Sequence, residues 1–93
     1  MVLTKRTEMT ALVESPCEIR VGTNIRGVPL GLTRNGRRER VAAIYEHWQS
    51  AEEARGNKPE RDYFRIKTNQ GLVCDIYRDM RVNRWYLSKI HCR

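Results

Sequence analysis

The chain has 93 residues and a net charge of +7, with 40% hydrophobic and 31% charged residues. This length predicts one domain with a modest core. No apolar run approaches the roughly 18 residues that a membrane-spanning helix needs, and the N-terminus lacks the apolar stretch of a signal peptide. We therefore expect a cytoplasmic protein that is not inserted in a membrane.

The first boundary along the chain is Ser15-Pro16, a dipeptide that favours a break between elements. We predict that residues 1–15 form a flexible N-terminal segment and that residues 16–93 form a single small β domain. Just beyond the boundary, residues 18–21 alternate polar and apolar side chains. This alternation is typical of a half-buried strand.

Residues 28–33 are a second candidate strand. Pro29 cannot donate a hydrogen bond to a neighbouring strand, so it fits a sheet edge or the start of a strand. The segment leads into Asn35-Gly36, the strongest short-range signal for a two-residue hairpin turn. We therefore expect the chain to return as another strand.

Residues 38–48 admit two interpretations. The large apolar residues have the i, i+3, i+4, i+7 spacing of one helix face: Val41, Ile44, Tyr45 and Trp48. The preceding hairpin turn instead requires a strand. The residue pattern alone leaves both open.

The C-terminal third predicts a three-stranded antiparallel meander, the smallest stable sheet. Its strands are expected at residues 62–68, 72–77 and 84–92, with Ile76 and Leu87 in the core. The turn at residues 69–71 contains a glycine that can take a positive φ.

Five short motifs follow one another in the chain: VPLGLTRNGRRERV from Val28, YEHW from Tyr45, DYFRI from Asp62, DIYRD from Asp75 and RWYL from Arg84. Their order resembles a small bacterial domain family of unknown function, found alone or as a C-terminal addition to Y-family DNA-polymerase-like proteins. The resemblance implies that residues 38–48 form a strand, and it suggests a role in bacterial DNA metabolism. The resulting prediction is a mostly β fold, a small antiparallel sheet or barrel-like meander of five to six strands, with a short helical segment near residues 50–55.

The residues that most often hold metals or act as nucleophiles show no motif. The candidate donors lack zinc-ligand spacing: His47, His91, Cys17, Cys74 and Cys92. Three cysteines, an odd number, predict reduced thiols rather than a disulfide framework. We expect no metal, no cofactor and no enzymatic activity.

The basic residues are the most suggestive feature. Residues 1–60 contain 10 Lys and Arg against 8 Asp and Glu, whereas residues 61–93 contain 8 against 3. A basic sheet face binds phosphate without reading sequence, and an aromatic residue on it can stack on an unpaired base. We predict single-stranded or duplex nucleic acid as the partner, bound by Arg34, Arg37, Arg38, Arg40, Arg61, Tyr63, Arg65, Lys67, Arg78, Arg81 and Arg84.

Two other interpretations remain open from the sequence. In the first, the cations have no binding role and are the polar side chains that the solvent-exposed face of a half-buried sheet carries. The alternative function is a protein-interaction module that docks on a polymerase-like or other protein through a sheet edge and two exposed aromatics, Trp85 and Tyr86.

Overall fold

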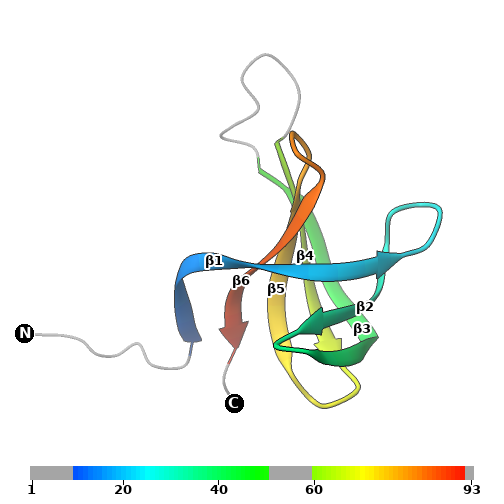
Figure 1. Ribbon diagram of the computed structural model, residues 1–93, viewed down its shortest axis with the longest axis vertical. Helices are drawn as coiled ribbons and strands as arrows, with labels where there is room; N and C mark the ends of the chain where they lie inside the picture. The colour runs from blue at the N-terminus through cyan, green and yellow to red at the C-terminus, as the bar shows by residue number, and fades with distance from the viewer. Residues whose placement is uncertain (1–9, 51–59, 92–93) are drawn as a thin grey trace, which may run out of the picture.

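The computed structural model shows a closed, antiparallel barrel of six strands that neighbour one another in chain order (Figure 1). It describes residues 10–50 and 60–91. The predicted mostly β, barrel-like meander is confirmed, and residues 51–55 of the expected helical segment lie outside the described residues. The strands are β1 (Thr10–Thr23), β2 (Pro29–Arg34), β3 (Arg37–Gln49), β4 (Arg61–Thr68), β5 (Val73–Asp79) and β6 (Arg84–His91).

The long strand β1 closes the barrel, because its first part pairs with β6 and its last part pairs with β2 (Figure 1). Its register with β6 shifts between Leu12 and Cys17, an interval that contains Pro16. A proline is tolerated at such an irregularity because no N–H is needed there. Residues 10–15 fall in the segment predicted to be flexible, yet they belong to β1, since the pairing with β6 extends to Thr10.

The hairpin between β2 and β3 turns at Asn35 and Gly36, as predicted. Asn35 has a φ of 50° and Gly36 a φ of 75°. Two successive positive φ values are what a type I′ turn requires, and this turn matches the twist of the strands that it joins. The turn therefore sets the register of β2 against β3.

Residues 38–48 lie within β3, so the helical interpretation is wrong. The register of β3 with β4 shifts twice, between Val41 and Ala43 and again between Ile44 and Glu46. Each shift adds a residue that moves the following side chains to the other face. The first shift puts Val41 and Ile44, three residues apart, on the inner face, whereas Tyr45 is the extra residue of the second shift and Trp48 lies on the outer face, so the helical spacing does not correspond to one face of the strand.

The core fills the barrel with buried side chains from five strands: Ile19, Leu32, Phe64, Ile66, Cys74, Ile76, Trp85 and Leu87. The predicted core positions Ile76 and Leu87 are confirmed. Beyond Leu87, a register shift in β6 brings Lys89 opposite Asp75 on the outer face. Among residues 10–50 and 60–91, no helix has the length and apolar character needed to cross a membrane.

Candidate nucleic-acid interface

The cations selected from the sequence lie on different outer surfaces of the barrel. One surface is the outer face of β4, β5 and β6, which carries Arg61, Arg65, Lys67 and Arg84, whereas Arg78 is paired with the core residue Trp85 and faces the inner side. The other is the outer face of β1, β2 and β3, which carries Arg38 and Arg40 of the first hairpin. The two surfaces differ in how many carboxylates accompany the positive charges.

Arg65, on the outer face of β4, is held by two carboxylates. Its Nε donates to Asp75 Oδ1 at 2.8 Å and its Nη2 donates to Asp75 Oδ2 at 3.2 Å, while its Nη1 lies 3.7 Å from Glu46 Oε1. Burial raises the pKa of the Asp75 carboxyl group, but hydrogen bonds from Arg65 and His91 outweigh it, so this pKa lies below its usual value. Arg65 is therefore committed to an ion pair within the fold.

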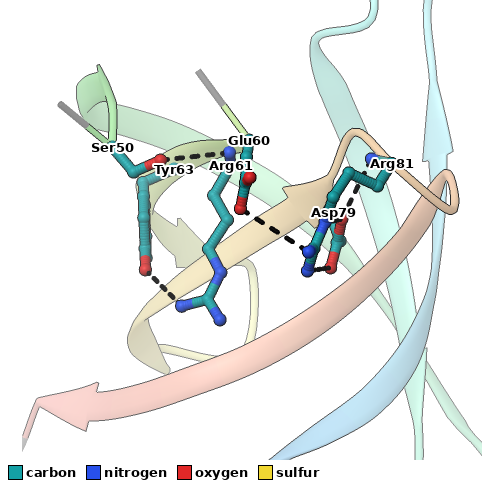
Figure 2. Close-up of polar contacts among 6 residues, drawn as sticks. All are labelled: Ser50, Glu60, Arg61, Tyr63, Asp79 and Arg81. Atoms are coloured by element: carbon teal, nitrogen blue, oxygen red, sulfur yellow. Dashed lines mark hydrogen bonds and ion pairs between the residues drawn. The ribbon is translucent and has the colours of Figure 1, made fainter. Parts of the chain in front are cut away.

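The turn between β5 and β6 holds a second group of paired charges (Figure 2). Arg81 Nη2 donates to Asp79 Oδ2 at 3.2 Å, and Arg81 Nη1 lies 3.6 Å from Glu60 Oε1. The hydrogen bond from the Arg81 side chain lowers the pKa of Asp79 below its usual value. This arginine also has its charge balanced within the molecule.

Two further predicted cations have partners nearby. Arg84 Nε lies 4.0 Å from Glu18 Oε2, across from β6 to β1. Arg78 Nε donates to Asn83 Oδ1 at 2.9 Å. Neither side chain stands alone on its surface.

Four aromatic rings form a row across the outer face of β3 to β6. Tyr63 stacks on Trp48 with ring centroids 5.2 Å apart, and on its other side it lies 5.1 Å from Tyr77, which stacks on Tyr86 at 5.3 Å. Arg61 Nη1 donates to the Tyr63 hydroxyl oxygen at 3.1 Å (Figure 2), and the Arg61 guanidinium lies 4.6 Å from the Tyr77 ring centroid. Trp48 thus stacks on one face of Tyr63 and the tilted Tyr77 ring lies on its other side, so the ring predicted to stack on a base already has ring partners on both sides.

Trp85, predicted for protein docking, lies in the core. Its side chain is 8% exposed, and its ring centroid is 5.8 Å from that of Phe64. Tyr86, the other predicted docking residue, is half-buried at the end of the aromatic row. The alternation along β6 separates these neighbours onto opposite faces of the barrel wall.

The outer face of β1, β2 and β3 forms a groove of about 690 Å³, which we call the basic groove. The register of the three strands determines which residues form the walls of the groove and which form its floor, where Gly22 and Gly31 lie. The two rows of outward positions across the three strands are Arg20, Thr33 and Arg38, then Gly22, Gly31 and Arg40. Since neighbouring strands lie about 4.8 Å apart, Arg20 and Arg38 stand about 10 Å apart on opposite sides of β2.

The arginines of the basic groove are unpaired. Arg20, Arg38 and Arg40 are exposed, and within the described part of the chain none of them has a carboxylate at ion-pairing distance. Glu39 lies between two of them in the sequence, but it pairs with the core residue Leu32 and is 8% exposed. Glu39 also lines the groove, but its side chain is on the inner side of the sheet, where its carboxylate lies 4.0 Å from Arg34, so the three exposed charges of the groove are positive.

Asn69, in the turn between β4 and β5, lines one side of the basic groove. The Asn69 backbone N–H donates to the Arg40 carbonyl at 2.9 Å, and the Asn69 side-chain oxygen accepts from the Arg40 N–H at 3.1 Å. These two bonds fix the backbone of Arg40 and the side chain of Asn69 relative to each other.

The remaining predicted cations lie outside the basic groove. Arg34 Nη2 is 4.0 Å from the buried Glu39 Oε2, so this arginine turns toward the inner side. Arg37 is exposed at the hairpin tip, and Lys67 is half-buried on β4. Of the eleven residues predicted to bind nucleic acid, the groove brings together Arg38 and Arg40.

Arg20 and the two glycines of the floor were missed from the sequence. The alternation of polar and apolar side chains at residues 18–21 places Arg20 on an outward face, so its orientation could have been predicted from the sequence. What links Arg20 to Arg38 is the pairing of β1 with β2 and of β2 with β3, which adjacency in the chain does not show.

The thiols and potential metal ligands form no second site. Burial raises the pKa of Cys74 to about 12, whereas Cys17 is exposed on β1. Among the described residues, no group of three or more His, Cys, Asp or Glu side chains is placed to hold a metal ion. Charge on the outer faces thus remains the main chemical feature of this domain.

Comparisons with known proteins add no assignment. No family model matches the sequence, and no significant similarity was found to a curated protein or to a solved structure.

Proposed function

We propose that this domain binds nucleic acid through phosphate contacts in the basic groove, without reading base sequence and without catalysing a reaction. The observation that carries the proposal is the set of three exposed arginines on one face of a three-stranded sheet, none of which has a carboxylate partner among the residues that the structure describes. The motif resemblance supports a role for this binding in bacterial DNA metabolism.

Electrostatics favour a polyanion at this groove. The Debye length at physiological ionic strength is about 8 Å, close to the spacing of the arginines, so their charges reinforce one another locally. A strand of nucleic acid that binds there releases condensed counterions, and this release supplies free energy that does not depend on base sequence. Arg65 and Arg81 contribute less, because Asp75 and Asp79 already neutralise them.

The alternative of protein docking has less support from the described residues. Trp85 is buried in the core, and Tyr86 stacks on Tyr77. The barrel closes through the pairing of β1 with β6, so neither of these strands offers a free edge along its paired length. We therefore keep nucleic-acid binding as the proposal.

The test is the salt dependence of binding to a labelled oligothymidylate, followed by fluorescence anisotropy between about 50 and 200 mM salt. Each phosphate contact to a single strand contributes a slope of roughly −0.7 in a plot of log affinity against log salt, so three arginines predict a slope of about −2. Absence of binding at the lowest salt concentration would refute the proposal.

Two double variants that remove the same number of positive charges distinguish binding in the groove from attraction by the net charge of the protein. Arg38→Gln with Arg40→Gln leaves one groove arginine and is expected to reduce the slope to roughly −0.7. Arg26→Gln with Arg84→Gln removes the same charge from exposed positions outside the groove and is expected to keep the wild-type slope. Equal losses in the two double variants would show that net charge, rather than the groove, governs binding.

A further inference from the structure

We infer that the floor of the basic groove is a seat for a nucleobase, so that the groove takes single-stranded nucleic acid in preference to duplex. The inference rests on the proposed function and specifies which form of the polymer the same site accepts.

The floor of the groove has room for a flat group. Gly22 and Gly31 face each other on β1 and β2, so two of the three outward positions in the row that ends at Arg40 have no side chain, next to the row in which Thr33 lies between Arg20 and Arg38. A Cβ atom at Gly22 would have no atom within 4 Å, whereas one at Gly31 would lie 3.2 Å from the Glu39 carbonyl oxygen, so the open space of the floor lies above Gly22. The groove volume of about 690 Å³ lies within the roughly 300–1,000 Å³ of small-molecule sites.

The walls and the floor suit different parts of a nucleotide. Arg20 stands on one wall, and Arg38 and Arg40 stand two residues apart on the other, where they can meet phosphates along a strand. The floor at Gly22 and Gly31 is peptide backbone, and Val21, Leu32 and Glu39 also line the groove. Guanidinium planes stack on bases. A base on this floor would therefore lie between arginines that can stack on its ring and bind the phosphate of the same nucleotide.

Asn69 adds a polar group at the rim. Its side-chain oxygen is occupied by the Arg40 N–H at 3.1 Å, so the rest of its amide, the NH₂ group, is left to donate to the edge of a base. A hydrogen bond to a base edge at the rim complements stacking on the floor.

The geometry favours an unpaired base over a duplex. Bases in a duplex keep both ring faces stacked and their pairing edges occupied, so reaching the floor would require unstacking that costs a few kcal/mol. The aromatic row on β3 to β6 is the other place where a base could stack, but its rings contact one another and Arg65 lies 5.6 Å from the Trp48 ring centroid. The glycine floor instead offers open space beside cations that are unpaired within the described part of the chain.

An abasic oligomer gives the first test, because it keeps the phosphates and lacks the bases. Wild-type protein is expected to bind a short oligothymidylate at least ~5-fold more tightly than an abasic oligomer of equal length, since one stacked base contributes at least this factor. It is also expected to bind the single strand more tightly than a duplex of equal length. Equal affinity for the thymidine and abasic oligomers would overturn the inference and leave the proposed function standing, whereas failure to bind either would overturn both.

Gly22→Val gives the second test. Gly22 does not have a positive φ, and its outward side is open, so a β-branched residue fits the strand while it fills the floor. The variant is expected to bind oligothymidylate no more tightly than the abasic oligomer, with its affinity for the abasic oligomer unchanged. Ala42→Val, at an exposed position of β3 outside the groove, is the matched control and is expected to keep the preference. A folded Gly22→Val protein that still prefers bases would contradict the inference.

Discussion

Arg65 and Asp75 form a two-point ion pair on the outer face of β4 and β5, with donor–acceptor distances of 2.8 and 3.2 Å. The pair belongs to a row of outward positions in which charge alternates from strand to strand: Glu46, Arg65, Asp75 and Lys89. Opposite charges at facing positions stabilise neighbouring strands. The row explains why the third of the chain that is most basic in sequence presents few free cations.

Replacement of Arg65 by methionine keeps most of the apolar stem and removes the guanidinium. Asp75, which is 2% exposed, then loses two hydrogen bonds and its nearest positive charge. We expect the free energy of unfolding in urea at neutral pH to fall by about 2–3 kcal/mol. Arg84→Gln is the control, since its 4.0 Å contact with Glu18 joins two exposed groups and should have no measurable effect. Wild-type stability in Arg65→Met would contradict the structural role of the pair.

The same pair predicts how stability depends on pH. The pKa of Asp75 is lowered in the folded state, because hydrogen bonds from Arg65 and His91 outweigh the effect of burial. Its contribution is therefore fully present above the unfolded-state pKa of about 3.9 and is lost as pH falls through the folded-state value. Urea unfolding over a pH series should show this loss on acidification in the wild type. Asp75→Asn should be less stable than the wild type at neutral pH and should lose less stability on acidification. Part of the pH dependence of stability should remain in this variant, because the pKa of Asp79 is also lowered in the folded state.

Cys74 and Cys17 should differ in reactivity. Burial raises the pKa of Cys74 to about 12, so at neutral pH its thiol stays protonated and out of contact with solvent. Cys17 is exposed. Alkylation with iodoacetamide, mapped by peptide mass spectrometry, should label Cys17 in the native protein and Cys74 only after unfolding. Rapid native labelling of Cys74 would show that the barrel opens or is packed differently.

The first hairpin should be sensitive to its glycine. Gly36 has a φ of 75°, so Gly36→Ala is expected to lower the free energy of unfolding by about 1 kcal/mol. Gly22→Ala is the matched control, because Gly22 has no positive φ and no atom near an added Cβ. This control should be neutral or slightly stabilising, since alanine restricts the unfolded chain. Equal effects of the two substitutions would argue against the type I′ turn.

Local signals were enough to predict most of the fold. The Asn35-Gly36 turn and the alternation of the C-terminal strands depend on residues close together in sequence, and these predictions hold. β3 was ambiguous because its two register shifts break the two-residue alternation on which strand recognition depends. Such shifts are set by the neighbouring strands, so the segment alone does not reveal them.

The candidate site depended on contacts between distant residues and was predicted only in part. Charge counted along the chain favoured residues 61–93, but pairing places Glu18 beside Arg84 and Glu46 beside Arg65. These acidic residues from the first half neutralise cations of the second. The pairing of β1, β2 and β3 instead gathers arginines around two glycines, a juxtaposition that no stretch of sequence contains.

A two-dimensional ¹H–¹⁵N NMR titration of the labelled domain with a short oligothymidylate tests the central claim most directly. The account predicts that the backbone amide signals that shift belong to the basic groove and its rim: Arg20, Gly22, Gly31, Arg38, Arg40 and Asn69. Shifts gathered instead around Tyr63 and Arg65 on the outer face of β4 to β6, with the groove signals unchanged, would contradict it.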